Sequence, residues 1–196
     1  MTGANLRGAN LDRVNLCGAN LTNINLRNAN LSRANLNWAN LAGAKLSGAT
    51  LNKAFLNGVN LSDAFLNGID LNGVDLNGVD LSKAKLSGVN LQDANLMAAN
   101  LKAAKIRGGS LTGANLTGSD LTEAFLDKAN LSWANLSNAD LSSADLSSAH
   151  LLGVKIEGAD FTGVTLTEEA RRYLCLIATG MTAWTHKHTK ETLMCS

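Results

Sequence analysis

The sequence predicts an all-β solenoid over residues 1–166, followed by a helical segment over residues 167–196. A large hydrophobic residue recurs at every fifth position from Leu6 to Leu166, and 30 of these 33 residues are leucine. A second apolar set lies two positions earlier, with 22 alanines, seven valines and two isoleucines. Because the phase never slips, the chain is a repeat array in which each unit buries its apolar groups only against its neighbours.

Each repeat is expected to contain one short extended edge and one corner. The central residue and the residue two positions earlier flank a position that is Asn or Asp in 22 of 33 repeats, so both apolar side chains point the same way. Of the 18 glycines, 16 lie two positions after a central residue, where a turn can require positive φ. A helix is the poorer alternative, because a five-residue period rotates the apolar stripe by about 140° per repeat and leaves no face continuously buried.

The repeat pattern A(D/N)LXX, as in Ala4–Gly8 (ANLRG) and Ala139–Ser143 (ADLSS), resembles the pentapeptide repeat family. This resemblance implies a right-handed quadrilateral β-helix with four pentapeptides per coil, and therefore about eight coils at a sheet-like spacing of about 4.8 Å. The family is abundant in cyanobacteria and its common features are not catalytic. A few members mimic DNA and bind gyrase, whereas others act in developmental regulation, and most have no known biochemical role.

Four repeats per coil would distribute the outward residues over four faces. The face around central residues 6, 26 and 46 carries seven cations against Asp127 and Asp145, a formal charge of +5; we call it the basic face. The candidate interaction surface on this face comprises Lys45, Phe65, Lys85, Lys105, Arg107, Phe125 and Lys128. Its phenylalanines are expected to be exposed between lysines. The alternative is that phenylalanine is simply tolerated there and the lysines only solvate the face.

A second face is acidic. Around central residues 21, 41 and 61, two lysines stand against Asp63, Asp80, Asp120, Glu123, Asp140 and Asp160, a formal charge of −4. This acidic face keeps open a DNA-mimic function directed at a DNA enzyme such as gyrase. The formal net charge of the chain is only +1, so direct nucleic-acid binding is not expected.

The composition changes after Leu166. Residues 167–180 are expected to form a helix with Thr167 as N-cap, Glu168 and Glu169 in the first turn and Gly180 as the C-terminal stop. A shorter helix is expected around residues 184–194. The segment is predicted to cap the last coil, whose open edge would otherwise invite association; dimerisation or partner docking by this helix is the alternative. The N-terminal end shows no such cap, which predicts a homodimer through that end or docking of another partner.

No residue constellation indicates catalysis, a metal or a cofactor, and the expected function is a rigid, non-enzymatic scaffold for an unidentified protein partner. The spacing of His186, His188 and Cys195 matches no structural zinc pattern. The sequence shows neither an apolar leader nor a membrane-length apolar run, so no membrane association is expected. Three cysteines without CxxC spacing favour a reducing, cytoplasmic location.

Overall fold

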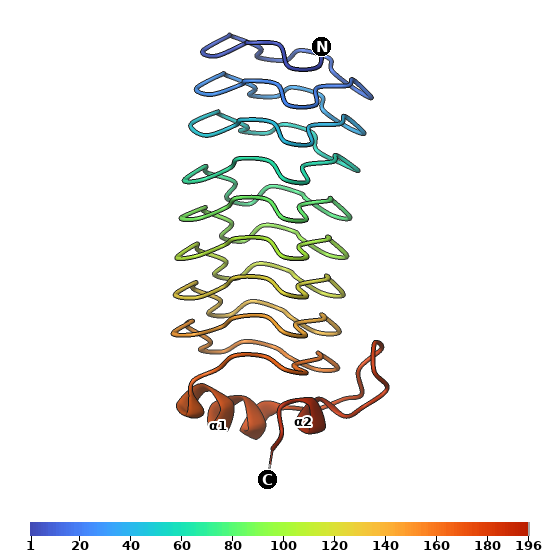
Figure 1. Cartoon of the computed structure of the whole chain (residues 1–196), viewed down its shortest axis with the longest axis vertical. Helices are drawn as coiled ribbons and strands as arrows, with labels where there is room; N and C mark the ends of the chain where they lie inside the picture. Colours follow the sequence, from blue (N-terminus) through green and yellow to red (C-terminus); the bar gives the residue numbers. More distant parts are fainter. Residues whose placement is uncertain (196) are drawn as a thin grey trace.

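The computed structural model describes residues 1–195 as a rod of stacked coils with two short helices, α1 and α2, at one end (Figure 1). Parallel bridges join residues twenty apart, from the Asn5–Asn25 pair to the Asp145–Thr165 pair. The bridging residue is always the one before the central residue. Twenty residues therefore complete one coil, which corresponds to four pentapeptides.

The backbone of each repeat forms two kinds of hydrogen bond. Between coils, the amide of Leu6 donates to Asn25 O over 2.8 Å and that of Gly8 donates to Arg27 O over 2.9 Å. Within the repeat, the Ala9 amide donates to Leu6 O over 3.1 Å and closes a turn. The third residue of the turn has positive φ, +68° at Gly8 and +58° at Arg13. This conformation explains the glycine preference, because only glycine adopts it without steric cost.

The interior of the rod is filled by the central residues and by the small residues two positions earlier. From Leu21 onward nearly all of them are buried, and each lies against the equivalent residues of the coils above and below. Each leucine removed from water contributes roughly 1.5–3 kcal/mol, most of which offsets backbone ordering. In the first coil Leu6, Leu11 and Leu16 stay partly exposed because no described coil covers them.

Asparagine ladders reinforce the outside of the rod. Asn25 Nδ2 donates to Asn5 Oδ1 over 3.0 Å, and Asn5 Oδ1 also accepts the Arg7 amide over 3.3 Å. The first bond joins neighbouring coils and the second supports the turn. Asparagine therefore recurs before the central residue because its amide supplies a donor and an acceptor at once.

After the repeats, α1 spans Glu168–Ile177 and α2 spans Thr189–Thr192. Thr167 is the N-cap of α1, and its hydroxyl accepts the Ala170 amide over 3.2 Å. The expected stop at Gly180 is wrong, because the chain is already extended at Ala178. The second helix is shorter than expected because the chain first forms a loop, which an antiparallel bridge between Met181 and His188 closes.

The helical segment supplies partners to backbone amides of the last coils. Gly158 N donates to Thr179 O over 2.9 Å, Phe161 N donates to Thr192 Oγ1 over 3.1 Å, and Gly153 N donates to the Tyr173 hydroxyl over 2.9 Å. Leu174 and Leu193 are buried in the same apolar cluster as the rod interior. Figure 1 shows the two helices lying across the end of the coils, with the loop between them reaching along one side.

A disulfide joins Cys175 in α1 to Cys195 beyond α2. This pairing differs from the reduced cysteines expected from the sequence, because the two residues meet only once the chain has folded back over the last coil. Cys17 is a free, exposed thiol. Over residues 1–195, neither helix has the length and apolar content needed to cross a membrane.

Candidate interaction surface

The structure brings five of the seven predicted surface residues into one column. Successive parallel bridges join Lys45 to Phe65, Phe65 to Lys85, Lys85 to Lys105 and Lys105 to Phe125. Each coil contributes one residue, so neighbouring side chains are spaced by about 4.8 Å along the rod. We call these five residues the basic column. Its regularity follows directly from the twenty-residue coil.

Cations cover both phenylalanine rings of the basic column. Lys85 Nζ lies 3.7 Å from the centroid of the Phe65 ring. Lys105 Nζ and Arg107 Cζ lie 6.0 Å and 5.6 Å from the centroid of the Phe125 ring. The rings are half-buried, not exposed as expected, because these cations lie over them. Such cation–π contacts stabilise each pair by about 0.5–1 kcal/mol and hold the charges in place.

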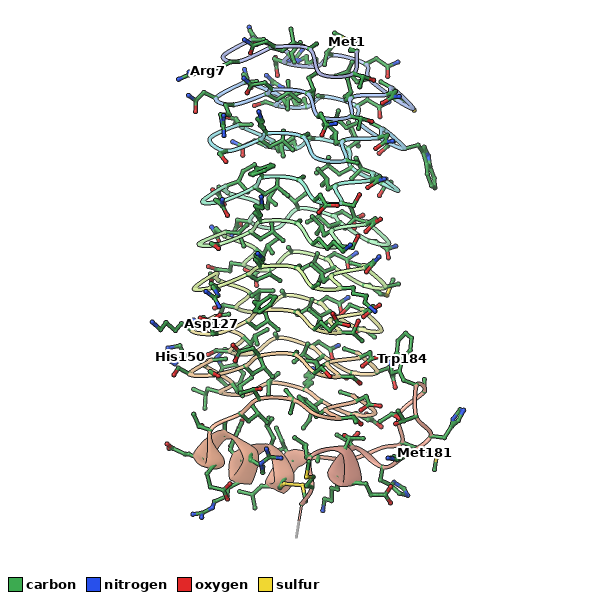
Figure 2. All side chains as sticks on the ribbon, viewed as in Figure 1. Met1, Arg7, Asp127, His150, Met181 and Trp184 are labelled. Carbon is green, nitrogen blue, oxygen red and sulfur yellow. A yellow bond between two sulfur atoms is a disulfide. The ribbon has the colours of Figure 1, made fainter. Side chains whose placement is uncertain are left out.

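The uncompensated positive charge of the basic face lies toward the N-terminal end of the rod. Arg107 Nε lies 2.8 Å from Asp127 Oδ1, an ion pair that neutralises the lower end. Within residues 1–195, Lys45, Lys85 and Lys105 form no ion pair with a carboxylate. Figure 2 shows Arg7 and Asp127 on the same side of the rod, the former near the N-terminal end and the latter much farther down.

The last predicted residue of the surface, Lys128, lies outside the basic column. It occupies the third position of a turn, with φ +60°, at the corner of the same face. Its side chain is exposed and forms no ion pair within the described part of the chain. Lys128 therefore borders the basic column instead of belonging to it.

The carboxylates of the acidic face are largely committed to internal hydrogen bonds. Asp80, Asp120 and Asp140 are half-buried, and Oδ1 of each accepts the backbone amide two residues later over 2.8–2.9 Å. Asp160 is fully buried, and its Oδ2 accepts the Thr185 hydroxyl of the loop between the helices over 2.6 Å. These carboxylates therefore support turns and the C-terminal loop, which weakens a phosphate-like surface.

Two aspartates have a pKa below the ordinary value. Burial of Asp160 opposes its ionisation, yet hydrogen bonds from Thr162 and Thr185, aided by the charge of Lys187, lower its pKa. Hydrogen bonds from the Ser147 hydroxyl and amide lower the pKa of Asp145, and Arg107 contributes. In each case the shift reflects stabilisation of the carboxylate by the folded structure, not a reactive site.

Chemical sites other than this surface are not evident in residues 1–195. No group of three His, Cys, Asp or Glu side chains is placed to hold a metal ion there. His150 lies on the side of the rod, away from the C-terminal loop that contains Met181 and Trp184 (Figure 2). Trp184 instead donates its indole N–H to Asn138 O over 3.0 Å, which attaches the loop to the rod.

Two features were missed by the sequence reasoning. One is the Cys175–Cys195 disulfide, for which the sequence gives no spacing signal. The other is a cavity of about 650 Å³ between residues 52–57 and residues 72–75. The disulfide depends on how the helical segment folds back over the last coil, and the cavity depends on how two particular coils pack. Neither is visible in the five-residue pattern.

Comparison with known proteins identifies the repeats. The family model for pentapeptide repeats matches in eight copies, over residues 1–37, 19–58, 54–93, 94–132 and 129–167. No curated protein matches the chain by sequence.

Solved structures give a similar result. Full-length QnrB1, a plasmid-mediated fluoroquinolone resistance protein, superposes with a TM-score of 0.77 at 18% identity, over 89% of this chain and 96% of QnrB1. A pentapeptide repeat protein from the thylakoid lumen of Arabidopsis thaliana is 40% identical over 64% of this chain and 91% of its own, with a TM-score of 0.44. HetL from the cyanobacterium Nostoc, involved in heterocyst differentiation, is 27% identical over 86% and 91%, with a TM-score of 0.43.

Proposed function

Because this chain belongs to the pentapeptide repeat family, whose members fold as right-handed quadrilateral β-helices, we propose that it is a non-enzymatic interaction scaffold. In this proposal about eight coils form a rod that binds a protein partner through the basic face. The rod supplies rigidity, because every coil is hydrogen-bonded to its neighbours along most of its length. The basic column supplies the contact.

The main support for a partner-binding role of the basic face is the positive charge of the basic column, which no carboxylate of the described residues neutralises. Lys45, Lys85 and Lys105 have no carboxylate partner within residues 1–195, although the chain carries 16 acidic residues against 17 basic ones. Two of these lysines lie over rings instead, Lys85 over Phe65 and Lys105 over Phe125. A lysine already held over a ring has little side-chain entropy left to lose, so ordering it on binding costs less free energy than ordering a freely rotating lysine.

The column fits an acidic protein surface better than a nucleic acid. A partner with carboxylates along an extended edge could place one charge near each rung, because both repeats are set by backbone geometry. Nucleic-acid binding generally uses a strongly basic surface, whereas the formal net charge of this chain is +1 and its neighbouring faces carry carboxylates.

Affinity capture from lysate of the source organism tests the proposal through variants. The test variant is Lys45→Glu, Lys85→Glu, Lys105→Glu. The control carries the same change in charge elsewhere, Lys53→Glu, Lys155→Glu, Lys190→Glu, at three exposed lysines without an ion pair in the described residues. We expect a partner retained by the wild type and the control but lost by the test variant. Equal retention by all three proteins would contradict the assignment of the basic face.

A DNA-mimic function directed at a DNA enzyme such as gyrase is the second candidate, favoured by the formal charge of −4 on the acidic face. The combined change Asp63→Asn, Asp80→Asn, Asp120→Asn, Asp140→Asn tests it in a gyrase supercoiling assay. Loss of an effect on gyrase in this variant, but not in the basic-column variant, would support mimicry. Absence of any wild-type effect on supercoiling would exclude it.

The two ends of the rod have different proposed roles. The helical segment acts as a cap that prevents end-to-end association, supported by its bonds to Gly158, Phe161 and Gly153. The partly exposed leucines of the first coil support a homodimer through the N-terminal end. Sedimentation between about 1 and 100 μM tests both roles. Charged substitutions in the first coil should abolish dimerisation, whereas charged substitutions at Leu174 and Leu193 in the cap should add end-to-end association.

The Cys175–Cys195 disulfide bears on the cellular compartment of the protein. A stable Cys175–Cys195 bond supports an oxidising environment in place of the cytoplasmic location expected from the sequence. Thiol alkylation of protein taken directly from cells tests this point: one reactive thiol, Cys17, supports oxidation, whereas three reactive thiols support a reducing compartment.

A further inference from the structure

The backbone ladder is interrupted between residues 48–58 and residues 67–77. Elsewhere in residues 1–166 the inter-coil hydrogen bonds described above repeat without a gap. Here seven of them are absent, and the donors left without an inter-coil partner are the amides of Gly48, Leu51, Lys53, Leu56, Gly58, Asp70 and Asp75. The bridges that would join Thr50 to Asp70 and Phe55 to Asp75 are also absent from the otherwise continuous series. We call this interruption the seam.

The seam is open to solvent. The cavity of about 650 Å³ lies along it. Ala54 and Val74 are partly exposed, although the equivalent inward residues of the other inner coils are buried. Phe55, at the edge of the seam, is 56% exposed. Figure 1 shows the spacing between coils widening where the colour changes from cyan to green. The seam therefore separates two coils that would elsewhere be in contact.

Only two of the four faces are open. On the basic face, Leu46 N still donates to Phe65 O over 2.9 Å, and on the acidic face Leu61 N donates to Asp80 O over 2.7 Å. Next to the seam, Asp80 N reaches Val59 O over 3.3 Å, longer than the equivalent bonds of the other coils. Two adjacent faces are thus joined and the other two are separated, which is the geometry of a hinge.

The residues on both sides explain why the ladder fails at this place. In closed columns an asparagine often donates its amide to the residue above, as Asn90 does to Asp70 and Asn95 does to Asp75. Across the seam this bond is missing. The carboxylates of Asp70 and Asp75 have no N–H to donate to the coil above, and the Phe55 side chain has no atom that could accept one.

Bulky interior residues add to this effect. The lower coil carries Ile69, Val74 and Val79 in three successive positions that are mostly alanine elsewhere. Ile24 lies beneath Ala4, and Phe125 above Asp145, in columns that stay closed. Neither a single branched residue nor a Phe–Asp pair is therefore sufficient by itself, and we attribute the opening to their combination.

We propose that the seam is a hinge at which two rigid segments of the rod, residues 1–58 and residues 67–166, bend relative to each other. The joined faces meet at the corner between the basic and acidic faces, so opening of the seam curves the rod toward that corner. Bending therefore changes the curvature of the basic face without breaking the bridge between Lys45 and Phe65.

Residue-resolved amide hydrogen exchange of the full chain tests the hinge. Leu51 and Leu56 are compared with Leu71 and Leu76, which donate to the coil below. We expect the Leu51 and Leu56 amides to exchange on the order of a hundredfold faster than those of Leu71 and Leu76, because no inter-coil hydrogen bond has to break before they exchange. Equally slow exchange at the four leucines would overturn the hinge.

A sealing variant tests the cause. The variant places asparagine pairs across the seam by combining Thr50→Asn, Phe55→Asn, Asp70→Asn and Asp75→Asn. Each pair can then form the side-chain hydrogen bond that Asn25 donates to Asn5. Exchange at Leu51 and Leu56 should slow at least about tenfold. The control, Asp120→Asn with Asp140→Asn in a closed column, should leave it unchanged. Unchanged exchange in the sealing variant would overturn the assigned cause.

Spin-label distances distinguish bending from a static gap, in a Cys17→Ser background. One pair, Ser32→Cys with Thr112→Cys, spans the seam by four coils, and the control pair, Asn72→Cys with Leu152→Cys, spans four coils below it. Both pairs are separated by about 19 Å along a straight rod. The hinge predicts a broader and longer distribution for the spanning pair alone. Distributions of equal width would overturn it.

Discussion

Lys85 Nζ lies 3.7 Å from the centre of the Phe65 ring, on the neighbouring coil and in the same column. The contact joins two residues twenty positions apart, so it exists only because the coil period brings them together. It also fixes a cation that has no carboxylate partner among residues 1–195. The candidate binding surface and the stability of the rod therefore share the same residues.

The first prediction concerns this pair. Lys85→Ala should lower the free energy of unfolding by about 0.5–1 kcal/mol, because the ring loses its cation and its cover. Lys155→Ala is the matched control, since Lys155 precedes a central residue but lies over no ring. Urea denaturation measures the difference. If both variants lose the same free energy, the cation–π contact does not contribute.

The second prediction concerns Val89 and Gly109, which follow each other in one interior column. A Cβ on Gly109 would lie 3.1 Å from Val89 Cγ1 and 3.0 Å from Ile106 Cγ2. Gly109→Ala should therefore destabilise the rod by about 1–2 kcal/mol through overpacking. The double variant Val89→Ala, Gly109→Ala should recover part of this loss in a double-mutant cycle. Additive losses would show that the two positions do not compensate.

The third prediction concerns Gly153, against which the Trp133 ring packs. A Cβ there would overlap the Trp133 ring at Cε3. Gly153→Ala should destabilise more than Gly118→Ala, because Gly118 has a similar positive φ but open space around it. The Trp133→Ala background should remove the difference. Thermal unfolding compares the variants, and equal losses in the wild-type background would exclude the steric explanation.

The fourth prediction concerns the disulfide. The paired change Cys175→Ser, Cys195→Ser should release the helical segment, because a bond that closes a loop of this size stabilises by about 3 kcal/mol. Limited proteolysis should cut residues 178–190 faster, while the repeats stay resistant. The free-thiol change Cys17→Ser is the control and should not alter the pattern. Unchanged cleavage would mean that the segment is held by its other contacts.

The fifth prediction concerns pH. The pKa of Asp160 is lower in the folded state, so its contribution to stability is complete above the pKa of the unfolded chain. That contribution is lost as the pH falls through the lowered folded pKa. Acidification should therefore release the loop that Thr185 anchors, and Trp184 fluorescence reports it. Asp160→Asn should weaken this acid transition, and an identical transition in the variant would exclude Asp160 as its cause.

Much of the fold could be predicted because the repeat is local. The spacing of Leu6, Leu11 and their successors determines which side chains point inward, and Thr167 marks the start of α1. Features that depend on pairs of coils could not be predicted. The cover over Phe65 and the seam each involve residues twenty positions apart on neighbouring coils, and pentapeptide periodicity alone does not give that period. The disulfide depends on the fold of the helical segment, which contains no repeat.

The candidate surface was predicted in its residues and in their order along one column, but not in its side-chain packing. The sequence identified the cations and rings of the basic column, and parallel bridges join five of them in one ladder. The burial of the rings and the pairing of Arg107 with Asp127 required coordinates. Their positions depend on side-chain packing between coils, which a single repeat does not contain.

Site-specific photocrosslinking shows directly whether the basic column contacts a partner. A benzophenone amino acid replaces Phe125 in the basic column or, in a matched protein, Phe55 on another face. We expect a partner to crosslink at position 125, and we expect the combined change Lys45→Glu, Lys85→Glu, Lys105→Glu to abolish the crosslinked product. A partner that crosslinks at position 55 and not at position 125 would contradict the assignment of the basic face.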